Sequence, residues 1–216
     1  YGFLSENANF ADLISKEGAV WIGPSSSVIT TMGDKMAARH LAEKAGSPVV
    51  PGTTKPLQNL NTAKKTAEKI GYPILIKAAA GGGGKGMRII KSFSELENAT
   101  ERAKSEANKA FSDDRIYIEK YLEEPHHIEI QILADHHGNV VCLGERECSI
   151  QRRYQKIIEE TPSPFINSKV RKNLIKTAIQ ISHSCKYTGV GTVEFLVDKN
   201  QNYYFLEMNT RLQVEH

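Results

Sequence analysis

The 216-residue chain lacks the features that mark several specialised classes of protein. None of its apolar runs approaches the roughly 20 residues that a membrane-spanning helix needs. Its 28 basic and 25 acidic residues are interspersed and leave a net charge of only +3, so no footprint of nucleic-acid binding is visible. We therefore expect neither a membrane nor a nucleic acid among its partners.

Cysteine is also scarce, and the signals of a chain start are missing. The three cysteines, Cys142, Cys148 and Cys185, lack the paired spacing of a metal site. Their odd number favours reduced thiols, so we expect a cytoplasmic protein, or a mitochondrial one in a eukaryote. The chain opens on "YGF", with no initiator methionine and no signal peptide, and we interpret it as a piece of a longer protein.

The composition that remains is ordinary for a soluble globular protein. Hydrophobic residues make up 40% of the chain and charged residues 25%, which is enough for one sizeable core or a domain and a half. The stretch "SPVVPGTTKP" is rich in Pro, Gly and Thr and predicts a connection between two parts of the chain.

Periodicity on both sides of this connection predicts an α+β fold. Helices are expected over residues 33–45, 61–70, 94–111 and 168–186, the third opened by a capping box of Ser94 and Glu97. Strands are expected over residues 19–22, 74–77, 87–91, 116–121, 128–133, 140–147, 192–197 and 203–209. We expect a smaller α+β piece at residues 49–121 and a larger sheet from residue 122 onward.

A glycine-rich stretch, "AAAGGGGKGMRII", lies between two of the predicted strands. Gly81, Gly83 and Gly86 satisfy the G-x-G-x-x-G pattern of dinucleotide-binding proteins, but a strand rather than a helix is predicted to follow. No Ser or Thr follows the Gly-Lys pair, as a P-loop requires, and Lys77 precedes the glycines, the reverse of the order in protein kinases. We interpret the stretch as a hairpin whose backbone N–H groups close over phosphate. The alternative is a surface hairpin without function.

Two acidic residues stand on apolar strands that a short turn joins. Glu194 lies in "GTVEFLV" and Glu207 in "YYFLEMN", so antiparallel pairing could bring them side by side. Carboxylates in an apolar setting need a cation or hydrogen-bonding partners. With Asn209 they offer the few oxygen ligands that Mg²⁺ takes from a protein. We predict a metal site here; the alternative is a cross-strand ladder in which Lys or Arg pairs with each acid.

The chain ends on "FLEMNTRLQVEH", in which polar residues stand at every second position. Successive side chains of an extended chain point to opposite faces. Glu207, Asn209, Arg211, Gln213 and Glu215 are therefore expected to share one face, opposite an apolar core face. The alternative is a half-buried strand whose outer face simply meets water.

These stretches together resemble the ATP-grasp enzymes, and biotin carboxylase in particular. The resemblance rests on "YGFLSENANFA", "IGPSSSVITTMGDK", "GYPILIKAAAGGGGKGMRI", "YIEKYLEEPHHIEIQILAD", "GERECSIQRRYQKIIEETPSP", "GTVEFLV" and "FLEMNTRLQVEH". The glycine loop is typical of ATP-grasp proteins, and the segments around "SIQRR" and "EMNTR" are typical of biotin-dependent carboxylases.

The resemblance implies an ATP-grasp fold, in which two α+β subdomains clamp ATP, present here as an incomplete fragment. Residues 1–21 would end an N-terminal domain, and residues 22–48 would form a helical linker. Residues 49–121 would form a mobile lid, and residues 122–216 the first part of the central domain.

The same resemblance implies an ATP site. Contacts with the phosphates and the lid are expected from Lys35, Lys77, Gly81, Gly82, Gly83, Gly84, Lys85, Gly86 and Met87. A hinge that holds adenine and three further nucleotide contacts are expected at Glu119, Lys120, Tyr121, Leu122, His127, Gln151 and Tyr154. Position 154 is often His in this family, so the tyrosine implies an altered nucleotide contact rather than lost function.

Metal and bicarbonate sites are implied as well. Glu194, Glu207 and Asn209 match ligands of Mg²⁺ or Mn²⁺, with two ions expected. The bicarbonate pocket and its catalytic groups are expected at Lys156, Arg211, Gln213, Val214 (through its backbone) and Glu215. Glu215 would act as general base, and Arg211 and Lys156 would hold the anion.

The implied reaction is ATP-dependent carboxylation of biotin, with a biotin carboxyl carrier protein or domain and a carboxyltransferase as partners. A homodimer is expected through regions mostly outside this chain. The segment "CSIQRRYQKIIEETPSP" looks most like the separate biotin carboxylase subunit of a bacterial acetyl-CoA carboxylase, which would serve fatty-acid synthesis, although propionyl-, methylcrotonyl- and pyruvate carboxylases share most of these residues. The alternatives are a carbamoyl-phosphate synthetase-like ligase that passes the activated bicarbonate to ammonia, and a non-catalytic nucleotide-binding module.

Overall fold

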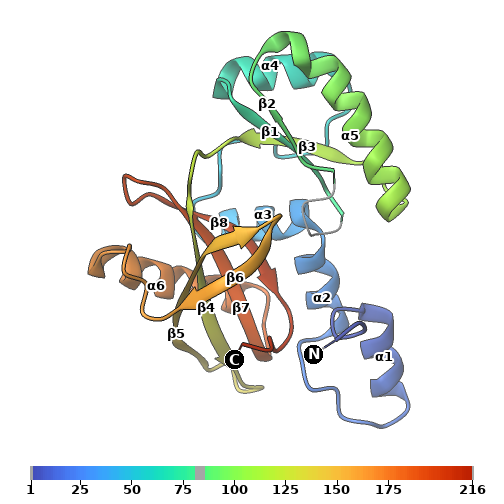
Figure 1. Ribbon diagram of the computed structural model, residues 1–216. Helices are drawn as coiled ribbons and strands as arrows, with labels where there is room; N and C mark the ends of the chain where they lie inside the picture. Colours follow the sequence, from blue (N-terminus) through green and yellow to red (C-terminus); the bar gives the residue numbers. More distant parts are fainter. Residues whose placement is uncertain (1, 81–85, 216) are drawn as a thin grey trace.

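Two antiparallel sheets organise the chain, which a computed structural model describes at residues 2–80 and 86–215. The smaller sheet has the strand order β2–β1–β3, with β1 at Ile74–Ala78, β2 at Arg88–Ile90 and β3 at Ile116–Lys120. The larger sheet has the order β6–β5–β4–β7–β8, with bounds β4 His126–Ala134, β5 Val140–Arg152, β6 Gln155–Glu160, β7 Gly189–Val197 and β8 Tyr203–Asn209. Figure 1 shows the small sheet above the large one. The expected α+β organisation is confirmed.

Three helices precede the first sheet: α1 Ala8–Lys16, α2 Ser26–Gly33 and α3 Lys35–Lys44. The Asp34 side chain accepts hydrogen bonds from the N–H groups of Met36 and Ala37 and so starts α3, the helix that the sequence predicts over residues 33–45. The helix α1 was not predicted, and α2 was expected only as part of the helical linker over residues 22–48. The strand predicted over residues 19–22 is wrong, because no strand among the described residues pairs with it and its Val20 and Ile22 side chains are exposed.

The smaller sheet packs on two helices, α4 Leu60–Ile70 and α5 Leu96–Phe111, which cover one of its faces. Alanines on both helices are fully buried against the sheet, which lets the helices approach closely. The predicted capping box of Ser94 and Glu97 is wrong: a 3₁₀ turn over Phe93–Glu95 precedes α5. The Glu95 side chain instead accepts from the backbone N–H of Lys91 at 3.1 Å.

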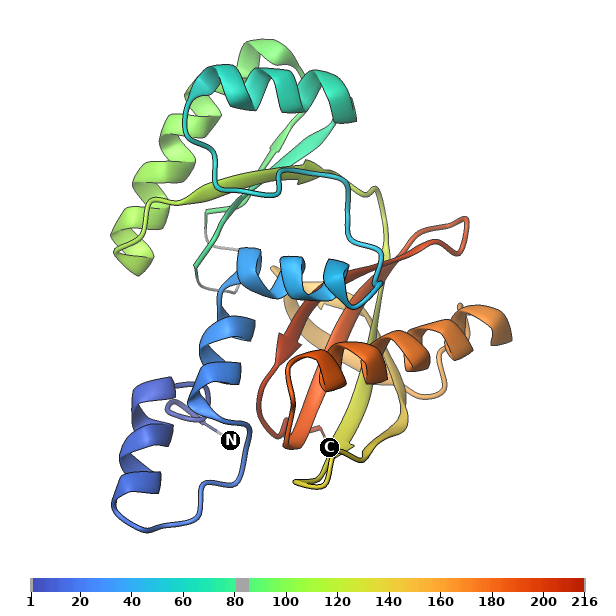
Figure 2. The same ribbon diagram turned by 180° about the vertical axis from the view of Figure 1, so that it is seen from behind.

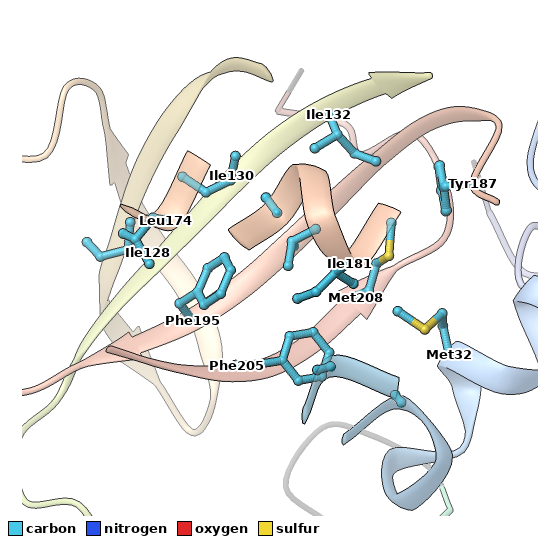
Figure 3. Close-up of a cluster of buried hydrophobic side chains, with 14 of the residues drawn as sticks. Met32, Ile128, Ile130, Ile132, Leu174, Ile181, Tyr187, Phe195, Phe205 and Met208 are labelled. Carbon is cyan, nitrogen blue, oxygen red and sulfur yellow. The ribbon is translucent and has the colours of Figure 1, made fainter. Parts of the chain in front are cut away.

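The larger sheet has one apolar and one polar face. Along β4, Ile128, Ile130 and Ile132 enter the core, while Glu129 and Gln131 point to the other side. The helices α3 and α6 (Ser168–Ser184) lie over the apolar face (Figure 2). Figure 3 shows the resulting core, in which aromatic and aliphatic side chains of β7 and β8 meet those of α6. The polar face is left open toward the small sheet.

A hairpin of β5 and β6 forms one margin of the polar face. The sequence predicts β5 only as far as residue 147, but the strand continues to Arg152, and β6 was not predicted. Arg152 pairs with Gln155, so Arg153 and Tyr154 form a two-residue turn in which both have positive φ, 52° and 65°. Such turns normally use Asn or Gly, and their absence hid this hairpin from sequence reasoning.

The segment 48–53 runs between the two sheets and bonds to both. Phe205 of the large sheet donates its N–H to the Pro48 carbonyl at 2.8 Å, and Lys120 of the small sheet donates to Pro51 at 2.7 Å. Gly52 lies so close to β3 that a Cβ there would meet the Ile118 carbonyl oxygen at 2.4 Å. Only glycine fits this approach. Within the described ranges, no helix is both long and apolar enough to cross a membrane.

Candidate functional site

A cleft of about 960 Å³ lies between the polar face of the large sheet and the open face of the small one. Most of the predicted site residues line it: Lys35, Lys77, Met87, Glu119, Lys120, Tyr121, Leu122, His127, Gln151, Tyr154, Lys156, Glu194, Glu207, Asn209, Arg211, Gln213, Val214 and Glu215. Gly86 is buried beside Ala78 and does not line the cleft, and the predicted loop residues Gly81, Gly82, Gly83, Gly84 and Lys85 lie outside the described residues. The two halves of the chain therefore meet where the sequence predicts a nucleotide.

A row of four charged side chains crosses the polar face of the large sheet, and two of them, Glu194 and Glu207, form the charged floor of the cleft. Strand pairing sets Arg146 of β5 opposite Glu129, Glu129 opposite Glu194, and Glu194 opposite Glu207. Directly opposed residues share one face of a sheet, so four charged side chains stand side by side across four strands. Sequence reasoning missed Arg146 and Glu129; the signal was a glutamate within the alternating "HIEIQIL" segment.

Glu194 is the most heavily coordinated carboxylate of the row. It accepts hydrogen bonds from His127 Nε2 at 2.8 Å, Lys156 Nζ at 3.1 Å and Asn209 Nδ2 at 2.6 Å. Burial opposes its negative charge, but the hydrogen bonds and charges of His127 and Lys156 prevail and lower its pKa to about 2. Burial likewise opposes protonation of His127, yet Glu194 raises the pKa of this histidine. The other ring nitrogen of His127 lies 2.9 Å from the Gln151 amide.

Glu207 holds the far end of the row. Its carboxylate accepts from Lys35 Nζ at 2.6 Å, and this lysine stands at the start of α3. Both predicted metal-binding acids therefore have a lysine partner, as the alternative of a charge ladder expects. Their oxygens, together with the Asn209 side chain, also form a set that suits a hard cation. The lysine charges are located where they neutralise these acids in the absence of such a cation.

The small sheet contributes one buried ion pair to the cleft. Lys77 Nζ donates to Glu119 at 3.0 Å, and Arg39 of α3 lies 3.9 Å from the other Glu119 oxygen. Burial disfavours the charge on Lys77, but Glu119 overcomes this effect and raises the lysine pKa. The rest of this side is largely apolar, with Leu75, Met87 and Ile89 in the lining.

The predicted bicarbonate residues gather at the end of the cleft near the C-terminus. Lys156 bridges Glu129 and Glu194 from β6. Burial lowers and these two carboxylates raise its pKa, and the net effect is a raised value. Gln213 is buried and accepts from Arg146 at 3.0 Å, whereas Glu215 is exposed to the cleft.

Arg211 is anchored by a residue that the sequence reasoning did not single out. Glu6 accepts from the Thr210 backbone N–H at 2.9 Å and from Arg211 Nε at 3.2 Å. The strand predicted over residues 203–209 is confirmed by β8, which ends at Asn209, and the alternation beyond it continues in an irregular segment. The side chains of Arg211, Gln213 and Glu215 nevertheless line the same cleft.

Other residues at the rim differ in their exposure. Tyr154 is 61% exposed, since it stands at the tip of the β5–β6 turn. Glu159 of β6 is partly buried; burial, with the nearby negative charge of Glu215, raises its pKa. The cleft thus has a charged floor, an apolar opposite wall and an acidic margin at its C-terminal end.

Two family models match the chain. The one described as Carbamoyl-phosphate synthase L chain, ATP binding domain, matches residues 34–216, and the one described as Biotin carboxylase, N-terminal domain, matches residues 1–29. Mitochondrial methylcrotonoyl-CoA carboxylase subunit alpha of Mus musculus is 52% identical over 216 residues, which are 100% of this chain and 30% of that protein. Biotin carboxylase 2 of Bacillus subtilis is 51% identical over 100% of this chain and 49% of its own length. The chain spans half or less of these relatives.

Solved structures match in the same way. A biotin carboxylase–β,γ-ATP complex from Campylobacter jejuni has a TM-score of 0.97 at 51% identity, over 100% of this chain and 48% of that one. The biotin carboxylase domain dimer of Hydrogenobacter thermophilus 2-oxoglutarate carboxylase, in complex with MgADP, ADP and bicarbonate, has a TM-score of 0.95 at 47% identity, with the same coverage.

Proposed function

The chain belongs to the biotin carboxylase family of ATP-grasp proteins, and we propose that the protein containing it is a ligase that carries out ATP-dependent carboxylation of biotin. The observation that carries this proposal is that three groups of side chains line one cleft. They are a buried lysine suited to bind phosphate (Lys77), two acids with an amide (Glu194, Glu207 and Asn209), and two cations at the C-terminal end (Lys156 and Arg211). The whole protein is meant, since the chain spans about half of its solved relatives. The domain limits at residues 21, 48 and 121 belong to the same proposal.

ATP is proposed to lie along the apolar wall with its phosphates over the charged floor. Leu75, Met87 and Ile89 offer the surface for adenine, and the hinge 119–122 offers backbone groups. The N–H groups of Lys120 and Tyr121 already bond to Pro51 and Pro73, so carbonyl oxygens and the Leu122 N–H are the groups for the base. Lys77 and Lys35, which line the cleft, are proposed to face the phosphates.

Mg²⁺ fits the set formed by Glu194, Glu207 and Asn209, because it takes a few protein oxygens and completes its shell with water and phosphate. When bound, it would neutralise charge that develops on the transferred phosphoryl group. Two ions are proposed, as in the family. Lys35 and Lys156 would then turn from the acids toward the phosphates and the bicarbonate.

Bicarbonate is proposed to bind between Lys156, Arg211 and Gln213, with the Val214 backbone at its edge. The planar guanidinium of Arg211 suits two oxygens of a planar anion. Arg211 uses Nε for Glu6 and Nη1 for the Leu212 carbonyl, which directs its remaining amino group to the anion. Glu215, exposed to the cleft, is placed to accept the bicarbonate proton.

The proposed carboxylation of biotin passes through carboxyphosphate. The deprotonated bicarbonate oxygen attacks the γ-phosphorus of ATP, and ADP leaves with the bridging electrons. The carboxyphosphate so formed breaks into CO₂ and phosphate. Phosphate takes the N1 proton of biotin, and N1 attacks CO₂. The described residues contribute positioning, charge neutralisation and one proton acceptor, and the wall of the small sheet excludes water from the intermediate.

A biotin carboxyl carrier and a carboxyltransferase are the proposed partners, and a homodimer is the proposed assembly. The three free cysteines agree with a reducing compartment such as the cytoplasm. Acetyl-CoA carboxylase, and with it fatty-acid synthesis, remains the proposed setting.

The test is ADP release by the intact protein with MgATP and bicarbonate, measured with and without free biotin. We expect biotin to stimulate the release. Bicarbonate-dependent release that ignores biotin and rises with ammonia would replace this function by carbamoyl-phosphate synthesis. Tight MgATP binding with no bicarbonate-dependent release would indicate a nucleotide-binding module.

A further inference from the structure

Arg146 lies behind the charged floor and touches two sides of the anion pocket. Its side chain, 12% exposed, is not part of the cleft lining. Nε binds the Glu129 carboxylate, Nη1 donates to Gln131 Oε1 at 2.9 Å, and Nη2 donates to Gln213 Oε1 at 3.0 Å. All three guanidinium nitrogens are thus engaged, and Nη2 also donates to Thr192 Oγ1 at 3.3 Å.

Gln213 depends on this contact for its position. It follows β8 in an irregular segment, and among the described residues no backbone–backbone hydrogen bond ties residues 210–215 to a neighbouring strand. Its side chain is nevertheless buried, and its carbonyl oxygen has Arg146 as donor. A buried amide on an irregular backbone is fixed by such a partner.

Lys156 depends on Arg146 indirectly. Lys156 stands on the edge strand β6 and bonds to Glu129, which is fully buried. Arg146 shares Glu129 with it, so the carboxylate is balanced from behind and the lysine charge is left for the cleft. Without the guanidinium, Glu129 would draw Lys156 toward itself and away from an anion.

We propose that Arg146 is a positioning residue for the bicarbonate pocket. It holds Gln213 directly and Lys156 through Glu129, so that the two side chains are spaced to bind one small anion. The proposal rests on the proposed function only for the identity of that anion. It assigns Arg146 no contact with substrate and no proton transfer.

The test replaces Arg146 in the intact protein and separates the two substrates. In Arg146→Gln, we expect the KM for bicarbonate to rise by about tenfold to a hundredfold, the range found when a residue that orients a metal ligand is removed. The KM for ATP should change by less than about twofold, because the nucleotide residues keep their partners. Arg146→Lys keeps a charge beside Glu129 but cannot donate to three side chains. Its KM for bicarbonate should therefore lie between those of the unchanged protein and of Arg146→Gln.

Arg171→Gln is the matched control. Arg171 also binds a buried glutamate on β5, donating to Glu145 at 2.6 Å, but it lies outside the cleft lining. The Arg171→Gln substitution should lower the free energy of unfolding without a selective change in the KM for bicarbonate. Equal changes in both KM values for Arg146→Gln, or the same bicarbonate effect in the control, would overturn the proposal.

A second readout does not need turnover. Line broadening of ¹³C-bicarbonate in the presence of MgADP reports binding of the anion alone, and Arg146→Lys serves here if Arg146→Gln does not fold. We expect weaker broadening for the Arg146 variants than for the unchanged protein and for Arg171→Gln. If biotin fails to stimulate ADP release while this difference persists, the proposed function falls and the role of Arg146 stands. Unchanged broadening in the variants, or none in the unchanged protein, would refute that role.

Discussion

The two walls of the cleft are built alike and equipped differently. Each is an antiparallel sheet with one face packed on helices and the other open to the cleft. The small sheet presents Leu75, Met87 and Ile89 around a single ion pair. The large sheet carries a row of charged side chains across four strands, each with one or more partners of opposite charge, and Glu194 and Glu207 of this row line the cleft.

The difference agrees with what the proposed function requires of each wall. A purine ring is an apolar surface with a few polar edges, so an aliphatic wall with free backbone groups suffices for it. Phosphates and bicarbonate carry charge that must be neutralised, and buried charges are stable only in networks that satisfy one another. The architecture of the sheet is therefore common to both, and the chemistry lies in the residues on the open face.

The largest expected effect comes from the centre of the charged row. Glu129→Gln leaves Arg146 and Lys156 without their shared carboxylate, so we expect a loss of about 3–5 kcal/mol in the free energy of unfolding. Urea denaturation of the intact protein measures it. Glu119→Gln on the other wall, which has one close ion pair, is the control and should lose less. Equal losses would contradict the contrast between the walls.

The next effect tests whether the small sheet serves the nucleotide alone. Lys77→Met should weaken ATP binding by about 1.5–3 kcal/mol, the range of hydrogen bonds to charged groups, and leave the KM for bicarbonate unchanged. Calorimetric titration with ATP measures the first quantity and steady-state kinetics the second. Arg88→Met removes a cation of the same sheet that pairs with Glu106, away from the cleft lining, and should change neither. A changed KM for bicarbonate in Lys77→Met would mean that the small sheet serves both the nucleotide and the anion.

A smaller effect concerns the anchor of Arg211. Glu6→Gln keeps an oxygen for the Thr210 N–H but removes the charge beside Arg211, so the KM for bicarbonate should rise by about tenfold, or about 1.4 kcal/mol. Substrate kinetics of Glu6→Gln and Glu6→Asp measure it, with partial recovery expected in Glu6→Asp. The exposed Glu17→Gln is the control. If the KM for ATP alone changes, Glu6 acts elsewhere.

The contrast also separates what the sequence could and could not predict. The strands β1, β3, β7 and β8 and the helices α4, α5 and α6 were predictable, because their apolar periodicity is sustained and turn residues bound them. The β5–β6 hairpin was not, since Arg153 and Tyr154 take a turn conformation without Asn or Gly. The strand expected over residues 19–22 failed for the opposite reason: its residues favour a strand, but no partner among the described residues pairs with it.

The site shows the same limit. Side chains within recognisable motifs, such as Lys77 and Glu194, were found in the sequence and lie in the cleft. Arg146 and Glu6 were not, because each acts through a contact that only strand register or tertiary folding creates. Period-two alternation predicts a face, whereas the neighbours across that face depend on pairing that no local pattern contains.

The smallest effect comes from an ion pair near the surface of the small-sheet half. Arg115 donates to Asp113 and to Asp34, and hydrogen bonds from Arg115 lower the pKa of Asp113. A lowered folded-state pKa contributes stability above the unfolded-state pKa of about 3.9, and that contribution is lost as the pH falls through the folded value. The Asp113 side chain is 20% exposed and Arg115 keeps Asp34, so Asp113→Asn should cost less than about 1 kcal/mol at pH 7.

Unfolding of the unchanged protein and of Asp113→Asn, followed from pH 7 toward pH 3, measures this difference, which should shrink as the pH falls. Glu129 and Asp113 are both acids paired with arginine, and they differ chiefly in burial and in the number of cations that depend on them. A loss in Asp113→Asn as large as in Glu129→Gln would mean that pairing alone sets the stability of such groups. A much smaller loss assigns that stability to burial, which explains why the charges of the row across the large sheet keep fixed positions.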